Sequence, residues 1–357
     1  MAWPLYLAMV TALVAVVLMI LPNPPLTNQA RLWMDKGSFF KFGNHDIFYI
    51  DEKGSNPNRG TVLIFHGYPT SSYDWNKILD DLKAEFSQVV MYDLLVLDSQ
   101  LPGAGKMGPK RLGHSFTISE QTDIGEVLLM KLGVKQAHIL SHDYGDTVAL
   151  ELLARHNQGH GRIHVLSLCL SNGGVFPETN HPRPIQRVLK NSVVGPIVSR
   201  FFFFKFFFKR SFGEVFGVMP SDEELDDIFT IKLHKDGNMV DSLLLNYVSE
   251  RAVHRDRWVG ALQTTKVPVH MIYGPADIVN PPAFIQFYKE NVPNPSITVL
   301  KSNIGHYPQF EAPKDFNVPN PSITVLKSNI GHYPQFEAPK DFATAYKTFL
   351  GSINHAQ

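Results

Sequence analysis

Two patterns of apolar positions alternate along the chain. Short runs dominated by apolar residues occur at 61–65, 88–92, 137–140, 164–170 and 267–273. Stretches with helical spacing occur at 72–86, 118–132 and 147–155, and residues 39–50 alternate as a half-buried strand or hairpin does. Short apolar strands separated by helices are typical of a parallel sheet covered on both faces. The pattern therefore predicts an α/β fold with a mostly parallel, doubly wound sheet.

The alternation stops after residue 172, and a helical pattern continues to about residue 265. We interpret residues 175–265 as a helical cap, inserted between two parts of the sheet domain at 36–174 and 266–357. The aromatic run FFFFKFFF lies within this cap, at 201–208. We expect it to pack on the sheet domain as an apolar helix. The alternative is a segment that dips into a membrane, because an exposed patch of this size needs a partner or a bilayer.

The N-terminal segment, residues 1–25, differs from the rest of the chain. It carries no charged side chain from residue 2 to residue 21. An apolar stretch of about twenty residues can cross a bilayer as a helix, so the segment is expected to be a membrane anchor. A cleaved signal peptide is the alternative, although no Lys or Arg precedes the run. Positive residues follow it instead, beginning with Arg31 and Lys36, which indicates that the catalytic part faces the cytosol.

Residues 291–316 recur without change as residues 317–342. Repeat architectures need at least three units, so two identical copies indicate a tandem duplication rather than a solenoid. Only one copy can fill a given position in the sheet. We expect the first copy, 291–316, to be an inserted loop.

Charge and cysteine content exclude several functions. Lys+Arg and Asp+Glu are equal at 33 each, so the chain has no general electrostatic attraction to nucleic acid. Cys169 is the single cysteine, which excludes an intrachain disulfide and a cysteine-rich zinc site. We expect neither a metal nor an organic cofactor.

The segment SHDYG at 141–145 carries the candidate nucleophile. It follows an apolar run directly and precedes a helical stretch, and it has the small-x-nucleophile-x-Gly pattern of a nucleophile elbow. The apex of this turn is Asp143. A carboxylate is ionised at neutral pH and attacks without the help of a base. Such a nucleophile suits a strained epoxide or an alkyl halide and forms an alkyl-enzyme ester.

Three further elements complete a candidate active site. The backbone N–H groups of Tyr68, in HGYP, and of Tyr144 are expected to form an oxyanion hole. Asp277 follows the last apolar run, and a histidine in GHYP occurs twice, as His306 and His332. The histidine would activate water while Asp277 orients it. We slightly favour His332, because its segment continues without a break into the expected final helix; His306 is the alternative.

Several segments carry a resemblance to a known family: HGYPTSSYDW at 66–75, LSHDYGD at 140–146, LCLSNGGVFPET at 168–179, RWVGAL at 257–262 and the repeated GHYPQFEAP. Over residues 33–353 the chain resembles the epoxide hydrolase and haloalkane dehalogenase branch of the α/β-hydrolases. The resemblance implies an α/β-hydrolase fold, a cap, hydrolase chemistry and residence in the endoplasmic reticulum membrane.

Departures from this family refine the expected reaction. Its dehalogenases hold the halide with an Asn after His-Gly and a Trp after the nucleophile; Tyr68 and Tyr144 stand there instead, which disfavours dehalogenation. Its epoxide hydrolases use cap tyrosines to donate to the epoxide oxygen, and Tyr247 has a suitable position. The alternative for Tyr247 is an ordinary amphipathic cap residue. Residues 94–113 also replace the glycine-rich turn of the family.

The leading hypothesis is a membrane-anchored hydrolase that acts on a small hydrophobic epoxide or lipid-like substrate, with membrane lipid as its other partner. A non-catalytic membrane scaffold or regulator on the same fold is the alternative, motivated by residues 94–113 and the duplicated histidine segment. An esterase or acyltransferase would need Ser or Cys at the apex, and Ser141 lies two positions before it.

Overall fold

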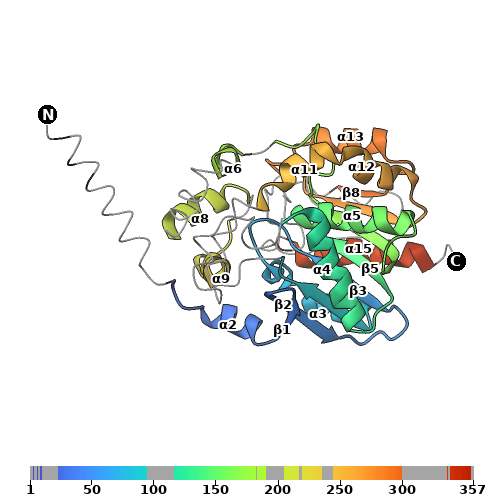
Figure 1. The fold of residues 1–357 in the computed structure, drawn as a ribbon, viewed down its shortest axis with the longest axis horizontal. Helices are drawn as coiled ribbons and strands as arrows, with labels where there is room; N and C mark the ends of the chain where they lie inside the picture. Colours follow the sequence, from blue (N-terminus) through green and yellow to red (C-terminus); the bar gives the residue numbers. More distant parts are fainter. Residues whose placement is uncertain are drawn as a thin grey trace.

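The fold is built around one eight-stranded sheet with the strand order β1-β2-β4-β3-β5-β6-β7-β8 (Figure 1). The computed structural model describes residues 23–94, 116–181, 183–189, 205–216, 219–234, 244–299 and 338–354, together with residues 3, 6, 9 and 336. The strands are β1 (Ser38–Phe42), β2 (His45–Lys53), β3 (Thr61–Phe65), β4 (Gln88–Tyr92), β5 (Gln136–Ser141), β6 (His164–Ser171), β7 (Val269–Tyr273) and β8 (Ile297–Val299).

The sheet is parallel except at one edge. β1 and β2 form an antiparallel hairpin where residues 39–50 predict one, and β2 runs antiparallel to β4. All pairs from β4 to β8 are parallel. Every residue of β3 is buried, as expected for a strand with helices over both faces. The predicted α/β architecture is therefore confirmed.

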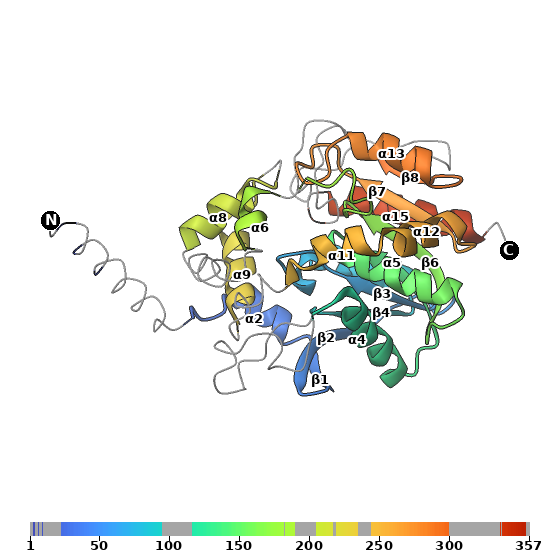
Figure 2. The same ribbon diagram turned by 45° about the horizontal axis from the view of Figure 1, so that its top comes forward.

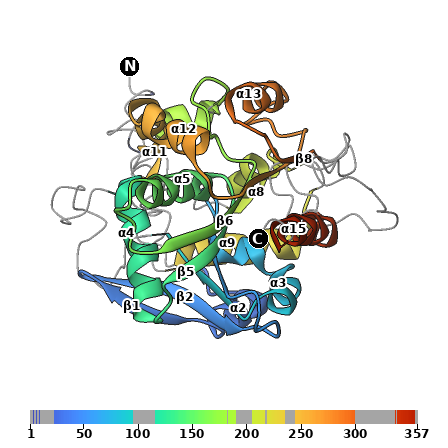
Figure 3. The same ribbon diagram turned by 90° about the vertical axis from the view of Figure 1, so that its right-hand side faces the viewer.

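Helices cover the sheet in two layers (Figure 3). One face packs against α4 (Ile118–Lys131), α5 (Tyr144–Asn157), α12 (Arg255–Thr264) and α13 (Ala283–Asn291). The other packs against α2 (Asn28–Met34), α3 (Leu79–Glu85) and α15 (Pro339–Asn354). The single helix predicted at 72–86 is instead a 3₁₀ turn, Ser72–Trp75, followed by α3, because Ile78 leaves helical geometry at φ −115° and ψ 3°.

Helices between β6 and β7 lie beyond the carboxyl ends of the strands (Figure 2). They include α6 (Pro184–Leu189), α8 (Lys205–Gly213), α9 (Asp222–Leu233) and α11 (Tyr247–Val253). α9 begins with a capping box, in which the Ser221 hydroxyl accepts from the Glu224 N–H while the Glu224 carboxylate accepts from the Ser221 N–H. α12, at the end of this segment, packs against α5, where the Glu151 carboxylate accepts hydrogen bonds from Arg257 and Trp258 of α12.

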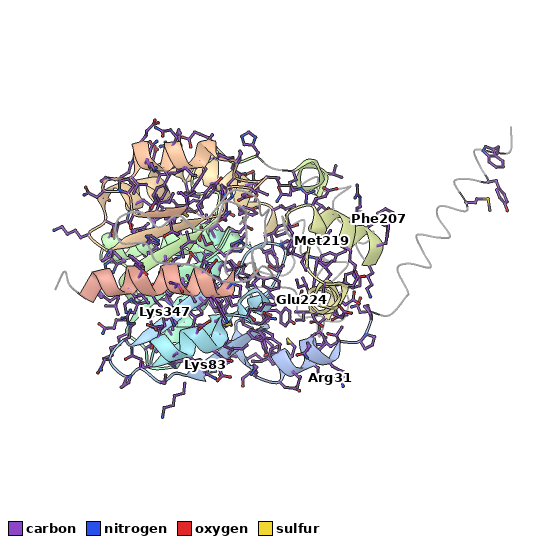
Figure 4. All side chains as sticks on the ribbon, turned by 180° about the vertical axis from the view of Figure 1, so that it is seen from behind. Arg31, Lys83, Phe207, Met219, Glu224 and Lys347 are labelled. Atoms are coloured by element: carbon purple, nitrogen blue, oxygen red, sulfur yellow. The ribbon has the colours of Figure 1, made fainter. Side chains whose placement is uncertain are left out.

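The aromatic run of the cap is divided between core and surface. Residues 201–204 lie outside the described part of the chain. Phe208 is buried and packs against Phe229 of α9 with ring centroids 5.3 Å apart, whereas Phe206 and Phe207 are 73% and 54% exposed. Figure 4 shows Phe207 on the outer side of the cap. Phe208 is therefore buried as expected, although the ring it contacts belongs to the cap and not to the sheet domain, and the expectation of burial is wrong for Phe206 and Phe207.

The first duplicated copy contributes a strand. Ile297 in β8 pairs with Met271 of β7 in parallel register and is fully buried. The expectation that residues 291–316 form an inserted loop is therefore wrong. The physical reason is that β8 follows α13 after a short connection, so the first copy completes the β7-α13-β8 unit. The second copy reaches into α15, and residues 300–335, with both candidate histidines, lie outside the described residues.

The expected membrane anchor also falls largely outside the described residues. Among the helices that are described, none combines the length and apolar character needed to cross a bilayer. Most of the unusual segment at 94–113 is likewise outside them, and only Leu94 is placed, at the end of β4.

Candidate active site

Asp143 occupies the apex of a sharp turn between β5 and α5. Its backbone is in a strained conformation, with φ 49° and ψ −109°, which L-residues adopt only when their surroundings enforce it. Two hydrogen bonds hold the turn: the Asp143 N–H donates to the Ser171 carbonyl at 3.0 Å, and the His142 N–H donates to the Phe65 carbonyl at 3.1 Å. The nucleophile elbow predicted from the sequence is therefore present, with Asp143 at its apex.

Two glycines allow the backbone segments to approach this turn. A Cβ on Gly145 would stand 2.7 Å from the His66 carbonyl oxygen, which belongs to the backbone and cannot move aside as a side chain would. A Cβ on Gly67 would stand 3.0 Å from the Asp143 Cβ. The loop after β3 can therefore lie directly against Asp143 only because residue 67 has no side chain.

The expected oxyanion hole is partly formed around Asp143 itself. The Tyr68 N–H donates to Asp143 Oδ2 at 2.9 Å. Tyr144 is the first residue of α5, so its N–H is among those that the helix leaves unpaired at the positive end of its dipole. One predicted donor therefore binds the carboxylate and the other belongs to the residue that follows it, and Asp143 itself is only 4% exposed.

Asp277 lies just beyond β7 and is held by three donors. Val279 N–H donates to Oδ1 at 2.7 Å, and the side-chain amides of Asn172 and Asn280 donate to Oδ2 at 3.1 and 3.2 Å. Asn172 follows Ser171, whose carbonyl accepts from Asp143. The end of β6 thus joins the candidate nucleophile to the candidate acid.

Tyr247 at the start of α11 brings the cap to the elbow. Its ring contacts Tyr144 edge-on, with centroids 4.8 Å apart, and its centroid lies 6.3 Å from that of Tyr68. Burial raises the pKa of the Tyr247 hydroxyl, and the charge of Asp143 raises it further, while Arg251 opposes the shift. The phenol therefore stays protonated as a hydrogen-bond donor. The hydroxyl of Tyr144 is also buried and has no hydrogen-bond partner among the described residues.

Asp146, three residues after the apex, supports the turn and was not singled out by the sequence. Its carboxyl group accepts from the Ser141 hydroxyl at 2.6 Å and from the N–H groups of Ser171 and Gly173 at 3.1 and 2.9 Å. Burial raises its pKa to about 7, partly opposed by these hydrogen bonds. An acidic residue in the first turn of a helix is commonplace, so only the position of β6 reveals this role.

His66 and Asp74 are two more buried polar residues near the elbow. His66 accepts from the Leu94 N–H through Nε2 at 2.9 Å, which leaves Nδ1 to donate to the Gly67 carbonyl at 2.8 Å. Burial lowers the pKa of His66, so it is a neutral structural residue rather than the catalytic base. Burial raises the pKa of Asp74 well above its ordinary range, and the charges of Asp93 and Asp143 add to this effect.

The structure thus brings together Asp143, Asp277, Tyr68, Tyr144 and Tyr247. His306 and His332 lie outside the described residues. Within the described chain, no three His, Cys, Asp or Glu side chains are grouped so that they could hold a metal ion.

Comparison with known proteins agrees with this architecture. The model of a family described as the alpha/beta hydrolase fold matches residues 60–313. The chain belongs to the α/β-hydrolase fold family. One relative is the mesoderm-specific transcript protein of Mus musculus. It is 42% identical over 303 residues, which cover 83% of this chain and 88% of the relative.

Solved structures of the α/β-hydrolase fold superimpose on most of the chain. The haloalkane dehalogenase DbeA from Bradyrhizobium elkani aligns with a TM-score of 0.64 at 19% identity, covering 90% of this chain and 99% of that one. A bacterial membrane phospholipase A aligns with a TM-score of 0.61 at 19% identity, covering 99% and 98%. At such identities these likenesses establish the fold, and the family with its hydrolase relatives supports a hydrolase.

Proposed function

We propose that the protein is a membrane-anchored hydrolase that opens a hydrophobic epoxide through an ester on Asp143. The observation that carries this proposal is the elbow itself: a carboxylate, and not a hydroxyl or thiol, occupies the strained apex at φ 49°. A carboxylate cannot be acylated usefully by an ordinary ester, but it attacks an activated saturated carbon directly.

In the first step an oxygen of Asp143 attacks an epoxide carbon. The Tyr68 N–H already binds Oδ2, so Oδ1 forms the new C–O bond and Oδ2 becomes the carbonyl oxygen of the ester. As the epoxide C–O bond breaks, its oxygen takes a proton from the Tyr247 hydroxyl. The burial of Tyr247 against Tyr144 supports this role, because a desolvated phenol is a stronger hydrogen-bond donor to a developing alkoxide.

In the second step a histidine removes a proton from water, and the hydroxide attacks the carbonyl carbon of the ester. The negative charge that develops on Oδ2 falls next to the N–H of Tyr68 and the start of α5. Collapse of this intermediate releases the diol and restores the Asp143 carboxylate. The histidinium returns its proton to the Tyr247 oxygen, so the sum is epoxide plus water giving diol. Asp277 would stabilise the histidinium.

Of the two candidate histidines we now propose His306. It follows β8 along the chain, and β8 is the strand that occupies the position beside β7. The residues matched by the family model end at 313 and so include His306 but not His332. His332 follows a copy of the same strand sequence that lies outside the described residues.

A single-turnover experiment in ¹⁸O-labelled water tests the mechanism. With protein in excess over a long-chain terminal epoxide, one ¹⁸O atom is expected in the peptide that contains Asp143, detected by mass spectrometry. Asp143→Asn provides the matched control without label, and His306→Ala is expected to trap the ester whereas His332→Ala is not. Label that appears only in the diol after single turnover, and never in Asp143, would show that water attacks the epoxide directly.

We further propose that residues 1–25 anchor the protein in the endoplasmic reticulum membrane. The exposed Phe206 and Phe207 of the cap support this, since paired aromatic side chains on a surface are favoured near lipid. Carbonate extraction of microsomes should leave the full chain in the pellet. Release of the full chain, together with equal release of a variant lacking residues 1–25, would refute the anchor.

A further inference from the structure

Arg251 on α11 is a buried cation beside the nucleophile. Arg251 is only 3% exposed, and its guanidinium carbon lies over the Tyr247 ring, 4.4 Å from the ring centroid. Nε donates to Thr147 Oγ1 at 2.8 Å, and Nη2 donates to the backbone carbonyl of Asp143 at 3.3 Å. These contacts are with neutral groups, and no carboxylate of the described residues pairs with Arg251.

Other arginines in the protein satisfy their charge differently. Arg155 contacts the carboxylates of Asp123, Glu126 and Glu151, each within 2.9 Å. Arg257 pairs with Glu151 at 2.7 Å. A guanidinium that is more buried than either of these, yet lacks an anionic partner among the described residues, is unfavourable in a protein interior. The missing negative charge is therefore a feature that needs an explanation.

The remaining nitrogen of Arg251 indicates where that charge would lie. Nη1 is buried and has no hydrogen-bond partner in the part of the chain that the structure describes. It stands 2.2 Å from the point that a Cβ of residue 174 would occupy, and the side-chain nitrogen of Asn180 stands 2.6 Å from the same point. Asn180 uses one N–H on Asn280 Oδ1, at 3.2 Å, and has a second to offer. Because residue 174 has no side chain, these two donors, one of them charged, can lie close to each other beside its backbone.

We propose that Arg251 and Asn180 form an oxyanion-binding subsite for a carboxylate carried by the substrate. Arg251 is the natural partner of a carboxylate, because charged N–H groups make stronger hydrogen bonds to it than neutral ones. The proposal deepens the function proposed above and rests on it for the reaction. The binding site itself does not depend on the chemistry at Asp143.

The position of this subsite restricts the substrate. Nη2 and Nη1 belong to one guanidinium, and Nη2 bonds the backbone of Asp143. A carboxylate on Nη1 therefore lies only a few atoms from the carbon that Asp143 attacks. The substrate class that fits is an apolar chain, of any length, that carries a carboxylate with the epoxide next to it. Arg251 lies between the two carboxylates and offsets their mutual repulsion.

Calorimetry with unreactive ligands tests the subsite in the full chain. Octanoate is expected to bind the wild-type protein more tightly than octan-1-ol. Arg251→Met should weaken octanoate binding about tenfold or more and leave octan-1-ol unchanged, since a charged hydrogen bond is lost. Arg255→Met is the matched control, because Arg255, four residues further along at the start of α12, pairs with Glu178 instead.

A second variant covers the case in which Arg251→Met fails to fold. Gly174→Ala places a methyl group 2.2 Å from Nη1 and should displace the guanidinium, with the same selective loss of octanoate binding. Equal binding of octanoate and octan-1-ol to wild type, or undiminished octanoate binding in Gly174→Ala, would overturn the subsite. If ¹⁸O never enters Asp143 but octanoate binding still depends on Arg251, the subsite stands while the ester mechanism falls.

Discussion

Replacing Asp146 by asparagine should make the stability of the protein less dependent on pH. The substitution keeps the shape of the side chain. With its oxygen at the Oδ2 position, asparagine still accepts from the N–H groups of Ser171 and Gly173. Its amide can donate to the Ser141 oxygen, which now donates to Asp146. The elbow is therefore retained, and the change isolates the titration of one carboxyl group.

The magnitude follows from the pKa of Asp146, which burial raises from 3.8 to about 7. Between these values the unfolded chain has lost the proton while the folded chain keeps it. Stability therefore falls as pH rises, by about 1.4 kcal/mol per pH unit at most. The whole effect is about 4 kcal/mol, absent below the unfolded pKa and complete above the folded one. Asp146→Asn should gain this much relative to wild type between pH 4 and pH 8.

Urea unfolding of both proteins across this pH range measures the effect. The difference between their unfolding free energies is the relevant quantity, because the other titrating groups cancel in it. Asp256→Asn is a suitable control, since the side chain of Asp256 is 98% exposed. A difference between Asp146→Asn and wild type that is flat from pH 4 to pH 8 would show that the hydrogen bonds, and not burial, set the pKa.

Two further substitutions test the packing around the site. Gly145→Ala places its methyl group 2.7 Å from the His66 carbonyl oxygen and should lower the unfolding free energy by about 3 kcal/mol or more, with loss of turnover. Gly351→Ala is the control in thermal unfolding, because a Cβ there would meet no atom within 4 Å. Equal thermal stability of the two variants would contradict the steric argument. Glu151→Gln should cost about 3 kcal/mol at pH 7. Burial disfavours its charge, but hydrogen bonds from Arg257, Trp258 and Arg155 outweigh this and hold its pKa below the ordinary value of 4.5. The cost should therefore be complete above that value and shrink as pH falls through the lowered pKa. A cost in urea unfolding that stays the same down to the acid limit of the folded state would exclude the ionic contribution.

Much of the fold was predictable from local pattern. β3 and β4 have the predicted bounds, and α4 starts at the predicted residue 118. A short apolar run reflects a strand buried on both faces, and helical spacing reflects a helix buried on one face, so both patterns can be recognised locally. The split between the 3₁₀ turn and α3 was not predictable, since the periodicity of residues 72–86 does not encode the break at Ile78. Two identical copies of one segment also could not be told apart by their own sequence. Only pairing with β7 distinguished them, and it selected the first copy.

The sequence by itself determined that an aspartate stands at the elbow, because the small residues flanking Asp143 are a local requirement of the turn. It also determined that Asp277, the candidate acid, follows Asp143, the candidate nucleophile, along the chain. Tertiary structure alone decided that the end of β6 connects Asp143 to Asp277 and that Asp146 is buried beneath the turn.

The same is true of Arg251. In the sequence it is one of several arginines on neighbouring helices of the cap, with nothing to set it apart. Folding places α11 over the elbow and removes that guanidinium from water, and none of the carboxylates in the described ranges pairs with it. Desolvation depends on what surrounds a group in space, and residues distant in the chain supply those surroundings; a linear pattern cannot contain this information.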